Sequence, residues 1–278
     1  MLRDMQFWKF RDVKIGVKDY FESLDVSGKT VVDAPAGEGR MSSFLSGLGA
    51  DVKALDLFTH GAADGGIEIV RADLTRPLPI STDSVDCILC QEGIEHLTDQ
   101  VSCLKEFNMV LKEHEVLIIT APNYSNLRAK FYTFFTESRS IRHLPANEVD
   151  DVRSGKDGNV YFGHVFLIGI QKLRLLASVA GFRIKNIHPT KVSGTSLVLF
   201  FLLYPVIFLL NIVAFYRSYN REREQAWNDK AARLDVFREI LRINLNLFVL
   251  LSDHLFVEFE KHPAIGSDSN ERLQMPLT

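Results

Sequence analysis

Acidic residues and glycines follow successive apolar runs of the sequence, at positions where they could contact a bound ligand. In the stretch VVDAPAGEGR, Asp33 ends an apolar run, and Gly37 and Gly39 come shortly after it. Glycine lets the backbone approach a ligand closely and adopt a positive φ. Asp56 ends the second run, where a carboxylate can accept both hydroxyls of a ribose, and Asp73 ends the third, placed to accept from an amine such as that of adenine.

The loop departs from the usual ligand-cradling pattern at one position. Such loops usually have glycine at three alternate positions after the acid, and here the first of these is Pro35. A dinucleotide loop needs G-x-G-x-x-G, and counting from Gly37 its third glycine would be Ser42. S-adenosylmethionine has no pyrophosphate and lays its amino-acid end against such a loop. The acids therefore favour S-adenosylmethionine, although each acid could instead cap a solvent-facing turn.

Alternating strands and helices must position these residues. We predict strands over 29–34, 51–57, 67–74, 84–93, 115–123, 182–189 and 253–261. Apolar residues recur at helical spacing over 39–50, 100–112 and 168–182. This alternation predicts a largely parallel sheet with helices on both faces, in which ligands bind beyond the carboxyl ends of the strands.

Composition narrows the class of protein. With 278 residues, 46% of them hydrophobic, and a formal net charge of −3, the chain fits one large α/β domain, with or without an elaboration. The near-neutral balance gives no electrostatic reason to expect a nucleic-acid partner. The three cysteines suit a reducing cytoplasm. Cys87 and Cys90 form C-x-x-C, but they would face opposite sides of a strand and no second pair follows, so we predict no metal site.

Taken together, these motifs resemble those of the class I S-adenosylmethionine-dependent methyltransferases, in the group called methyltransferase type 11. The resemblance covers residues 28–190 and rests on VVDAPAGEGR, ALDL, RADL, LPISTDSVDCILCQEGIEHLTD and GHVFLIGIQKLRLLASVAGF. The family loop usually reads D-x-G-x-G-x-G, and one branch reads D-x-P-x-G-x-G-R, which accounts for Pro35. The resemblance implies a Rossmann-like fold with a mostly parallel seven-stranded sheet and an antiparallel last strand.

The resemblance also implies S-adenosyl-L-methionine as cofactor, and roles for individual residues. The loop would hold the methionine end, Asp56 the ribose, and Asp73 and Leu74 the adenine. The implied cofactor-binding residues are Asp33, Ala34, Gly37, Gly39, Asp56, Leu57, Asp73, Leu74, Gln91 and Glu92. A hydroxyl acceptor would need a general base, and His96 and His164 are the catalytic candidates. The alternative for each histidine is a packing or capping role.

An apolar stretch sets the last third of the chain apart. SLVLFFLLYPVIFLLNIVAFY, residues 196–216, has no charged residue and is about long enough to span a bilayer. If 253–261 is the final strand, residues 191–252 are an apolar helical insertion between the last two strands, and a single crossing would separate that strand from its sheet. Pro205 favours a kink or hairpin. The alternatives are a membrane-docked hairpin or interfacial helix, an apolar cover over the active site or a dimer interface, and a single span.

We therefore predict a cytoplasmic methyltransferase, peripheral or hairpin-anchored on the inner face of the membrane. Its acceptor would be small or lipid-linked, such as a glycan precursor, and a homodimer is an alternative use of the apolar surface. Two other functions stay open: a nicotinamide-dependent Rossmann oxidoreductase, and a non-catalytic adenosyl-binding protein at the membrane. The expected parts are an N-terminal helical segment (1–27), the cofactor domain (28–190) with an acceptor lid (124–164), the insertion (191–252), the final strand (253–262) and a disordered tail (263–278).

Overall fold

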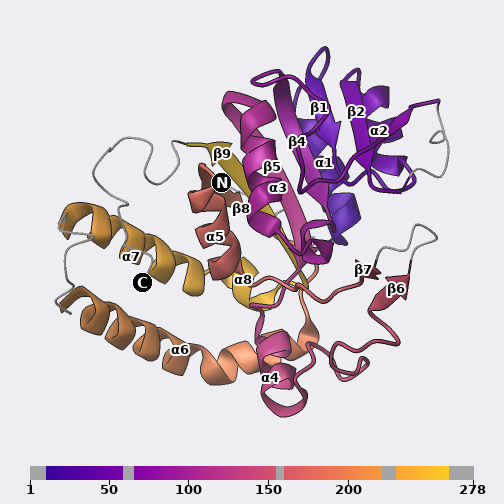
Figure 1. The fold of residues 1–278 in the computed structure, drawn as a ribbon. Helices are drawn as coiled ribbons and strands as arrows, with labels where there is room; N and C mark the ends of the chain where they lie inside the picture. The colour runs from indigo at the N-terminus through magenta and orange to yellow at the C-terminus, as the bar shows by residue number, and fades with distance from the viewer. Residues whose placement is uncertain (1–10, 59–65, 155–159, 221–229, 263–278) are drawn as a thin grey trace, which may run out of the picture.

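The computed structural model describes residues 11–58, 66–154, 160–220 and 230–262, and its centre is a seven-stranded sheet (Figure 1). The strand order is β3-β2-β1-β4-β5-β9-β8. The strands are β1 (Thr30–Asp33), β2 (Asp51–Asp56), β3 (Ile69–Arg71), β4 (Val85–Gln91), β5 (Leu111–Pro122), β8 (Phe182–Ile187) and β9 (His254–Lys261). β1 to β5 pair in parallel, and β9 runs antiparallel to both β5 and β8. The predicted fold class is confirmed.

The register of the sheet brings the predicted site residues to one edge. Asp33 at the end of β1 lies level with Leu89 of β4, and Asp56 at the end of β2 lies level with Arg71 of β3. Gln91 at the end of β4 pairs with Thr120 of β5. β1 and β4 are neighbours although they are not consecutive, so the order in which strands are added to the sheet reverses between them. Open α/β sheets bind ligands at such a point.

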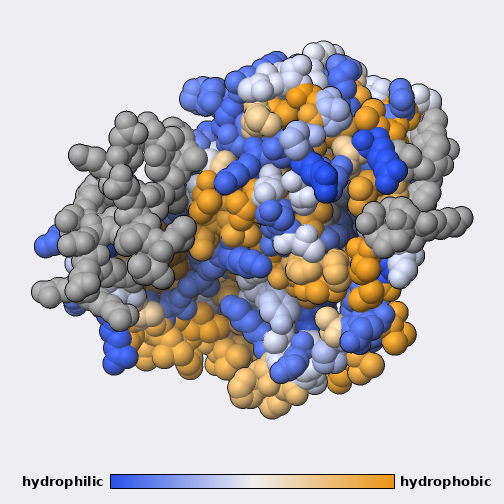
Figure 2. Space-filling view, in the orientation of Figure 1, coloured by the Kyte–Doolittle hydropathy of each residue, from blue (hydrophilic) through white to orange (hydrophobic). Residues whose placement is uncertain are grey.

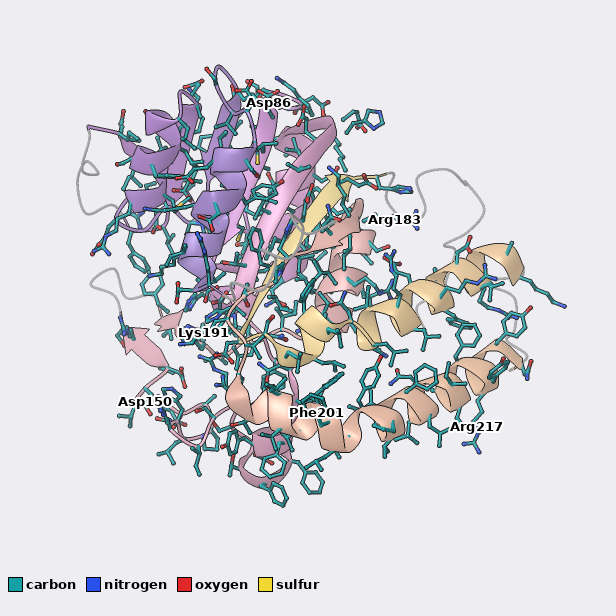
Figure 3. The ribbon with its side chains drawn as sticks, turned by 180° about the vertical axis from the view of Figure 1, so that it is seen from behind. Asp86, Asp150, Arg183, Lys191, Phe201 and Arg217 are labelled. Atoms are coloured by element: carbon teal, nitrogen blue, oxygen red, sulfur yellow. The ribbon has the colours of Figure 1, made fainter. Side chains whose placement is uncertain are left out.

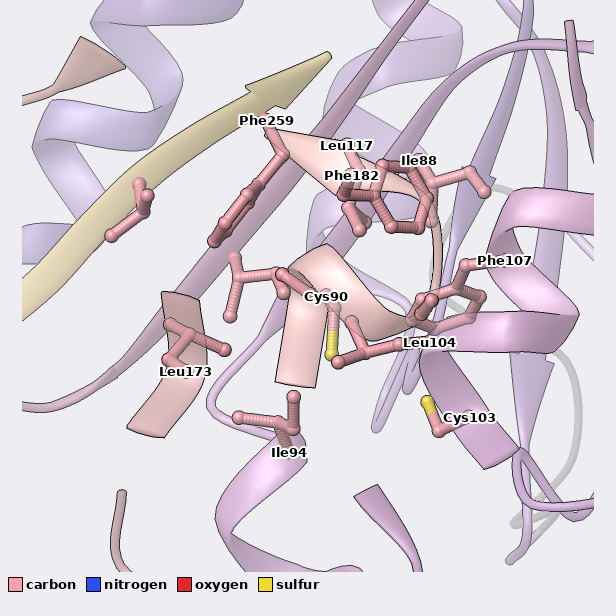
Figure 4. Close-up of a cluster of buried hydrophobic side chains, with 14 of the residues drawn as sticks. Ile88, Cys90, Ile94, Cys103, Leu104, Phe107, Leu117, Leu173, Phe182 and Phe259 are labelled. Atoms are coloured by element: carbon pink, nitrogen blue, oxygen red, sulfur yellow. The ribbon is translucent and has the colours of Figure 1, made fainter. Parts of the chain in front are cut away.

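Helices cover both faces of the sheet. α1 (Val13–Ser23) and α2 (Arg40–Gly47) pack on one face, and α3 (Gln100–Val110) and α5 (Ile170–Val179) pack on the other. Figure 4 shows the second core, in which Cys90 of β4 lies among the side chains of α3 and η2 (Ile94–His96). Cys87 belongs to the first core, so the two thiols face opposite sides as predicted. Burial raises the pKa of each thiol.

Other predicted segments differ in detail. β3 has three residues where a strand over 67–74 was predicted, because the chain turns at Asp73. The predicted lid contains α4 (Leu127–Thr136) and an antiparallel hairpin of β6 (Val152–Ser154) and β7 (Val160–Phe162). The predicted disordered tail, 263–278, lies outside the described residues, as do 1–10 of the N-terminal segment and 221–229 of the insertion.

The insertion between β8 and β9 consists of α6 (Gly194–Asn220), α7 (Lys230–Asn244) and α8 (Leu247–Leu251). α6 is long and apolar enough to cross a membrane by length and composition alone. It continues unbroken through Pro205, so a hairpin within 196–216 is wrong. Side chains on both sides of the proline, including Phe200 and Ile207, pack on Leu250 and Leu251. The chain returns through α7, which lies alongside α6 (Figure 1).

A chain of amide side chains joins α6 to α5 through α7. Gln171 of α5 donates through Nε2 to Asn244 Oδ1 of α7 at 2.8 Å, and Asn244 Nδ2 donates to Asn211 Oδ1 of α6 at 2.7 Å. Asn211 Nδ2 donates in turn to the Ile207 carbonyl at 2.8 Å. One face of α6 is therefore tied to protein.

The other face of α6 is apolar and exposed. Its side chains include Phe201, 74% exposed, and Leu202, 68% exposed. Phe201 is labelled on α6 in Figure 3, and the lower edge of the space-filling view is largely hydrophobic over α6 and α4 (Figure 2). We call this the outer face of α6, defined by Val198, Phe201, Leu202, Val206, Leu209, Leu210, Val213 and Tyr216.

We expect Asn211→Leu to lower the free energy of unfolding by about 1 kcal/mol, because Asn244 would lose its acceptor. Chemical denaturation in mild detergent would measure the change. Val213→Leu, on the outer face of the same helix, is the matched control and should change stability by less than about 0.5 kcal/mol. Equal stability of the two variants would show that the amide chain does not hold α6.

Candidate active site

The loop after β1 is held in shape by the acid at the end of β2. Asp56 Oδ2 accepts from the Gly37 N–H at 2.8 Å, and its Oδ1 accepts from the Phe58 N–H at 2.8 Å. Gly37 has a φ of 57°, and a Cβ added there would meet nothing within 4 Å. The loop thus exposes open space above Gly37, while Asp56 fixes the backbone beneath it. Each carboxylate oxygen can accept a further hydrogen bond, so the predicted ribose contact of Asp56 stays a prediction.

Asp33 lies inside the protein and joins β1 to α2. Its side chain is 1% exposed, and Oδ2 accepts from the Ser42 hydroxyl at 2.6 Å. Burial raises the pKa of Asp33 to about 7, against the lowering effect of the Ser42 bonds. Ser42 occupies the position where a dinucleotide loop would have its third glycine. The sequence analysis treated Ser42 as a missing glycine, and the structure gives it a partner that glycine could not serve.

Pro35 fills space beside the segment that follows β4. A Cβ added to Gly93 would lie 2.2 Å from Pro35 Cδ and 2.6 Å from Pro35 Cγ, so the two residues are in close contact. The loop after β1 and the turn after β4 therefore support each other through the proline ring. This contact gives Pro35 a structural reason to stand where the family usually has glycine, and Gly93 is a site residue that the sequence analysis missed.

The end of β4 carries polar groups with unusual backbone and burial. Gln91 Nε2 is buried and has no hydrogen-bond partner among the described residues. Glu92 adopts a φ of 50°, a region that is costly for a side-chain-bearing residue and that recurs at functional sites. Its Oε1 accepts from the Thr120 hydroxyl at 3.0 Å, and its Oε2 lies 3.5 Å from His254 Nε2. Burial raises the pKa of Glu92.

Asp73 closes a turn in this structure. Its Oδ1 accepts from the backbone N–H of Thr75 at 3.0 Å and from the Thr75 hydroxyl at 2.7 Å, and its Oδ2 lies 3.3 Å from Arg76 Nε. These bonds match the alternative in which the acid caps a turn, and the adenine contact stays a prediction. Of the remaining implied cofactor residues, Leu57 is half-buried, and the buried ones are Ala34, Gly39 and Leu74.

The two candidate catalytic histidines lie side by side. The ring centroids of His96 and His164 are 4.9 Å apart. His96 Nδ1 lies 3.1 Å from the Phe162 carbonyl oxygen and 3.0 Å from that of Gly163, so it donates to the lid. Burial and the neighbouring His96 lower the pKa of His164. The fold therefore brings together two residues that the sequence places far apart.

The lid hairpin reaches across the sheet edge. Tyr161 of β7 packs edge-on against Phe58, directly after β2, with ring centroids 4.6 Å apart. Phe162 and Gly163 contact His96 after β4. The hairpin thus passes from the end of β2, where Asp56 lies, to the histidine pair.

Comparison with known proteins agrees with this arrangement. Residues 32–119 match the family model described as a methyltransferase domain. A ubiquinone biosynthesis O-methyltransferase from Paraburkholderia phytofirmans is 25% identical over 137 residues, which is 46% of this chain and 59% of that protein. A probable S-adenosylmethionine-dependent methyltransferase from Mycobacterium tuberculosis is 28% identical over 102 residues, 35% of this chain and 37% of that protein.

A solved structure shares the fold. The YcgJ protein of Bacillus subtilis superposes with a TM-score of 0.52 at 13% identity, covering 90% of this chain and all of that one. The predicted resemblance to S-adenosylmethionine-dependent methyltransferases is confirmed: residues 32–119 match the methyltransferase domain model, and one of the relatives is named as S-adenosylmethionine-dependent. The match spans only about half the length of the first curated relatives, 59% and 48% of them.

We expect Gly93→Ala to destabilise the protein by about 1–3 kcal/mol, because the new methyl group would overlap the rigid ring of Pro35. Replacing Pro35 with glycine in the same chain should remove most of this cost. Urea denaturation of the two single variants and the double variant gives the coupling free energy. Gly47→Ala, whose Cβ would meet nothing within 4 Å, is the control. Additive effects at Pro35 and Gly93 would contradict the contact.

Asp33→Asn should change how stability depends on pH. The folded-state pKa of Asp33, about 7, lies above the ordinary value of 3.8, so between these values the unfolded chain releases a proton that the folded chain keeps. This carboxyl therefore lowers wild-type stability as pH rises through that window, by at most about 1.4 kcal/mol per pH unit. The asparagine variant lacks this loss. Its free energy of unfolding, relative to that of wild type, should therefore rise from pH 4 to 7 and then level off. A difference in free energy of unfolding between the two proteins that stays constant from pH 4 to 7 would contradict the assignment. Asp25→Asn, at an exposed position, is the control.

Proposed function

We propose that the protein is an S-adenosylmethionine-dependent methyltransferase that binds its cofactor over the loop of Gly37 and methylates an acceptor beneath the lid. The observation that carries the proposal is the bond from Gly37 to Asp56, which holds a glycine loop open at the sheet edge within the matched domain. The same match favours this reading over a nicotinamide-dependent oxidoreductase.

The reaction needs little chemistry from the protein. The sulfonium is an activated donor, so the site must align the acceptor atom, the methyl carbon and the sulfur, and exclude water. The acceptor atom forms a bond to the methyl carbon while the carbon–sulfur bond breaks, and the electron pair stays on sulfur. The relatives named O-methyltransferases support an oxygen acceptor. A hydroxyl must also lose its proton, and His96 and His164 lie together at this edge to assist that loss.

The acceptor is proposed to be a small or lipid-linked molecule that the protein meets at a membrane surface. α4 of the lid packs on α6, and the Arg128 N–H donates to the Ser196 hydroxyl at 3.1 Å between them. α4 exposes an aromatic group beside the outer face of α6, in which Phe134 is 82% and Phe135 is 65% exposed. Large exposed apolar surfaces of this kind mark interaction sites.

A helix lying in the membrane interface fits this surface better than a helix crossing the bilayer. Phe200, Tyr204 and Ile207 of α6 pack on α8, which leads directly into β9. To cross the bilayer, α6 would have to give up these contacts and the amide chain through Asn211. Lying flat, it can insert the outer face while its inner face stays on the protein, and burial of apolar area at about 25 cal/mol per Å² would favour docking.

Asp56→Ala should weaken binding of S-adenosylhomocysteine by roughly 2–4 kcal/mol, a factor of about 30 to 1,000, because the ribose acceptor and the support of Gly37 are lost together. Calorimetric titration measures this, with NAD as the competing ligand for wild type. Asp51→Ala, at the exposed start of the same strand, should bind as wild type does. Wild-type binding of NAD, or unchanged affinity in Asp56→Ala, would contradict the proposed site.

Flotation with phospholipid vesicles tests the membrane surface. We expect the wild-type protein to float with vesicles, and detergent to release it more completely than high salt. Lysines at Leu202 and Leu209 should reduce flotation at least tenfold, because charges on the outer face oppose insertion. The control carries lysines at Ile15 and Leu175, which are each 49% exposed on other helices. A soluble dimer that does not float with vesicles would contradict membrane docking. It would support the alternative in which the apolar surface forms a dimer interface.

A further inference from the structure

Three side chains near the end of β4 form a group that the proposed cofactor site does not use. Glu95 and His96 come from η2, and His164 follows β7 of the lid. Each offers one ligand atom, and these three atoms all lie within 4.8 Å of one another. Two imidazoles and a carboxylate are the ligand types that divalent transition metals prefer.

The carboxylate of Glu95 lacks a partner. The residue is 0% exposed, and neither Oε1 nor Oε2 has a hydrogen-bond partner among the described residues. Buried polar side chains are almost always bonded, and a buried charge needs a counter-charge. A metal ion beside Glu95 would give its two oxygens the partner that they lack among the described residues.

The histidines are oriented as metal ligands usually are. His96 Nδ1 lies within 3.1 Å of two carbonyl oxygens, which can only accept, so Nδ1 carries the hydrogen and Nε2 keeps its lone pair. Metal-bound histidines commonly donate their other nitrogen in this way. His164 is exposed, which leaves a path for an ion to enter.

We propose that Glu95, His96 and His164 bind a divalent transition metal ion of the Zn²⁺ type, with open positions that face the acceptor. Three protein ligands with a vacant position are typical of catalytic rather than structural metal sites. The prediction of no metal site considered the cysteines alone, and it missed this group because the fold, and not the sequence order, brings His164 to η2.

The role of the ion rests on the proposed function. An acceptor hydroxyl bound to the metal through oxygen would have a lower pKa and would release its proton to solvent before transfer. Its oxygen would then form the bond to the methyl carbon, the carbon–sulfur bond would break, and S-adenosylhomocysteine would leave as a neutral thioether. His96 and His164 would thus act as ligands, and the ion would take the place of a general base.

Metal binding is tested on tag-free, full-length protein that has been dialysed against a chelator. Titration with Co²⁺ should give one tight site per chain, with visible absorption bands that report nitrogen ligands, and Zn²⁺ should displace it. His164→Ala and Glu95→Gln should each weaken Co²⁺ binding at least tenfold. His114→Asn, at an exposed histidine of β5, should bind as wild type does. Failure of the wild type to bind either ion, or unchanged binding in both variants, would overturn the proposal.

Two further measurements separate this proposal from the proposed function. Zn²⁺ should raise the melting temperature of wild type but not that of Glu95→Gln, whatever reaction the protein catalyses. Titration with S-adenosylhomocysteine should give the same affinity for wild type, His164→Ala and Glu95→Gln, since none of these side chains is assigned to the cofactor. Metal binding without cofactor binding would reject the methyltransferase alone. Cofactor binding without metal binding would reject the metal site alone. His96 and His164 would then be the candidates for the general base, as in the proposed function.

Discussion

The hydrogen bonds of the Asp56 carboxylate organise the whole edge of the sheet. One oxygen holds the Gly37 N–H of the loop after β1, and the other holds the Phe58 N–H of the turn after β2. The loop can present open space above Gly37 because the acid below it replaces the bonds that its backbone would otherwise lack. The turn after β2 also places Phe58 against Tyr161 of β7.

Further contacts connect the loop after β1 to η2 and to the hairpin of β6 and β7. Pro35 in the loop touches Gly93 after β4, and η2 follows directly. From η2, His96 bonds to the carbonyl groups of the lid. The loop, the turn after β4 and the lid are therefore one connected unit.

The sequence predicted the features that depend on local pattern. Apolar periodicity was enough for the seven strands of the sheet, and the family resemblance implied the antiparallel β9. Features that depend on contacts between distant segments were beyond it. The proximity of His164 to His96, the bond between Thr120 and Glu92, and the contact of Gly93 with Pro35 all arise from tertiary packing. The hydrogen bond from Ser42 to the buried Asp33 likewise became visible only in the structure.

The insertion also combines features that the sequence predicted with one that depends on tertiary packing. Its apolar character and its place between β8 and β9 were evident from the sequence, because they follow from composition and from the pattern of the last strand. Pro205 suggested a kink or a hairpin, but α6 is continuous through it, and side chains on both sides of the proline pack on α8. An isolated helix would have no such support, so local propensity alone gave the wrong answer there.

The central claim is that the cofactor lies over Gly37 with its sulfur directed toward η2 and the lid. A crystal structure with S-adenosylhomocysteine tests it most directly. The account predicts ribose hydroxyls within hydrogen-bond distance of Asp56, and the sulfur between the loop and the pair formed by His96 and His164. A ligand found instead in the surface depression along β2 and β3, lined by Lys53, Val70 and other side chains, would contradict it.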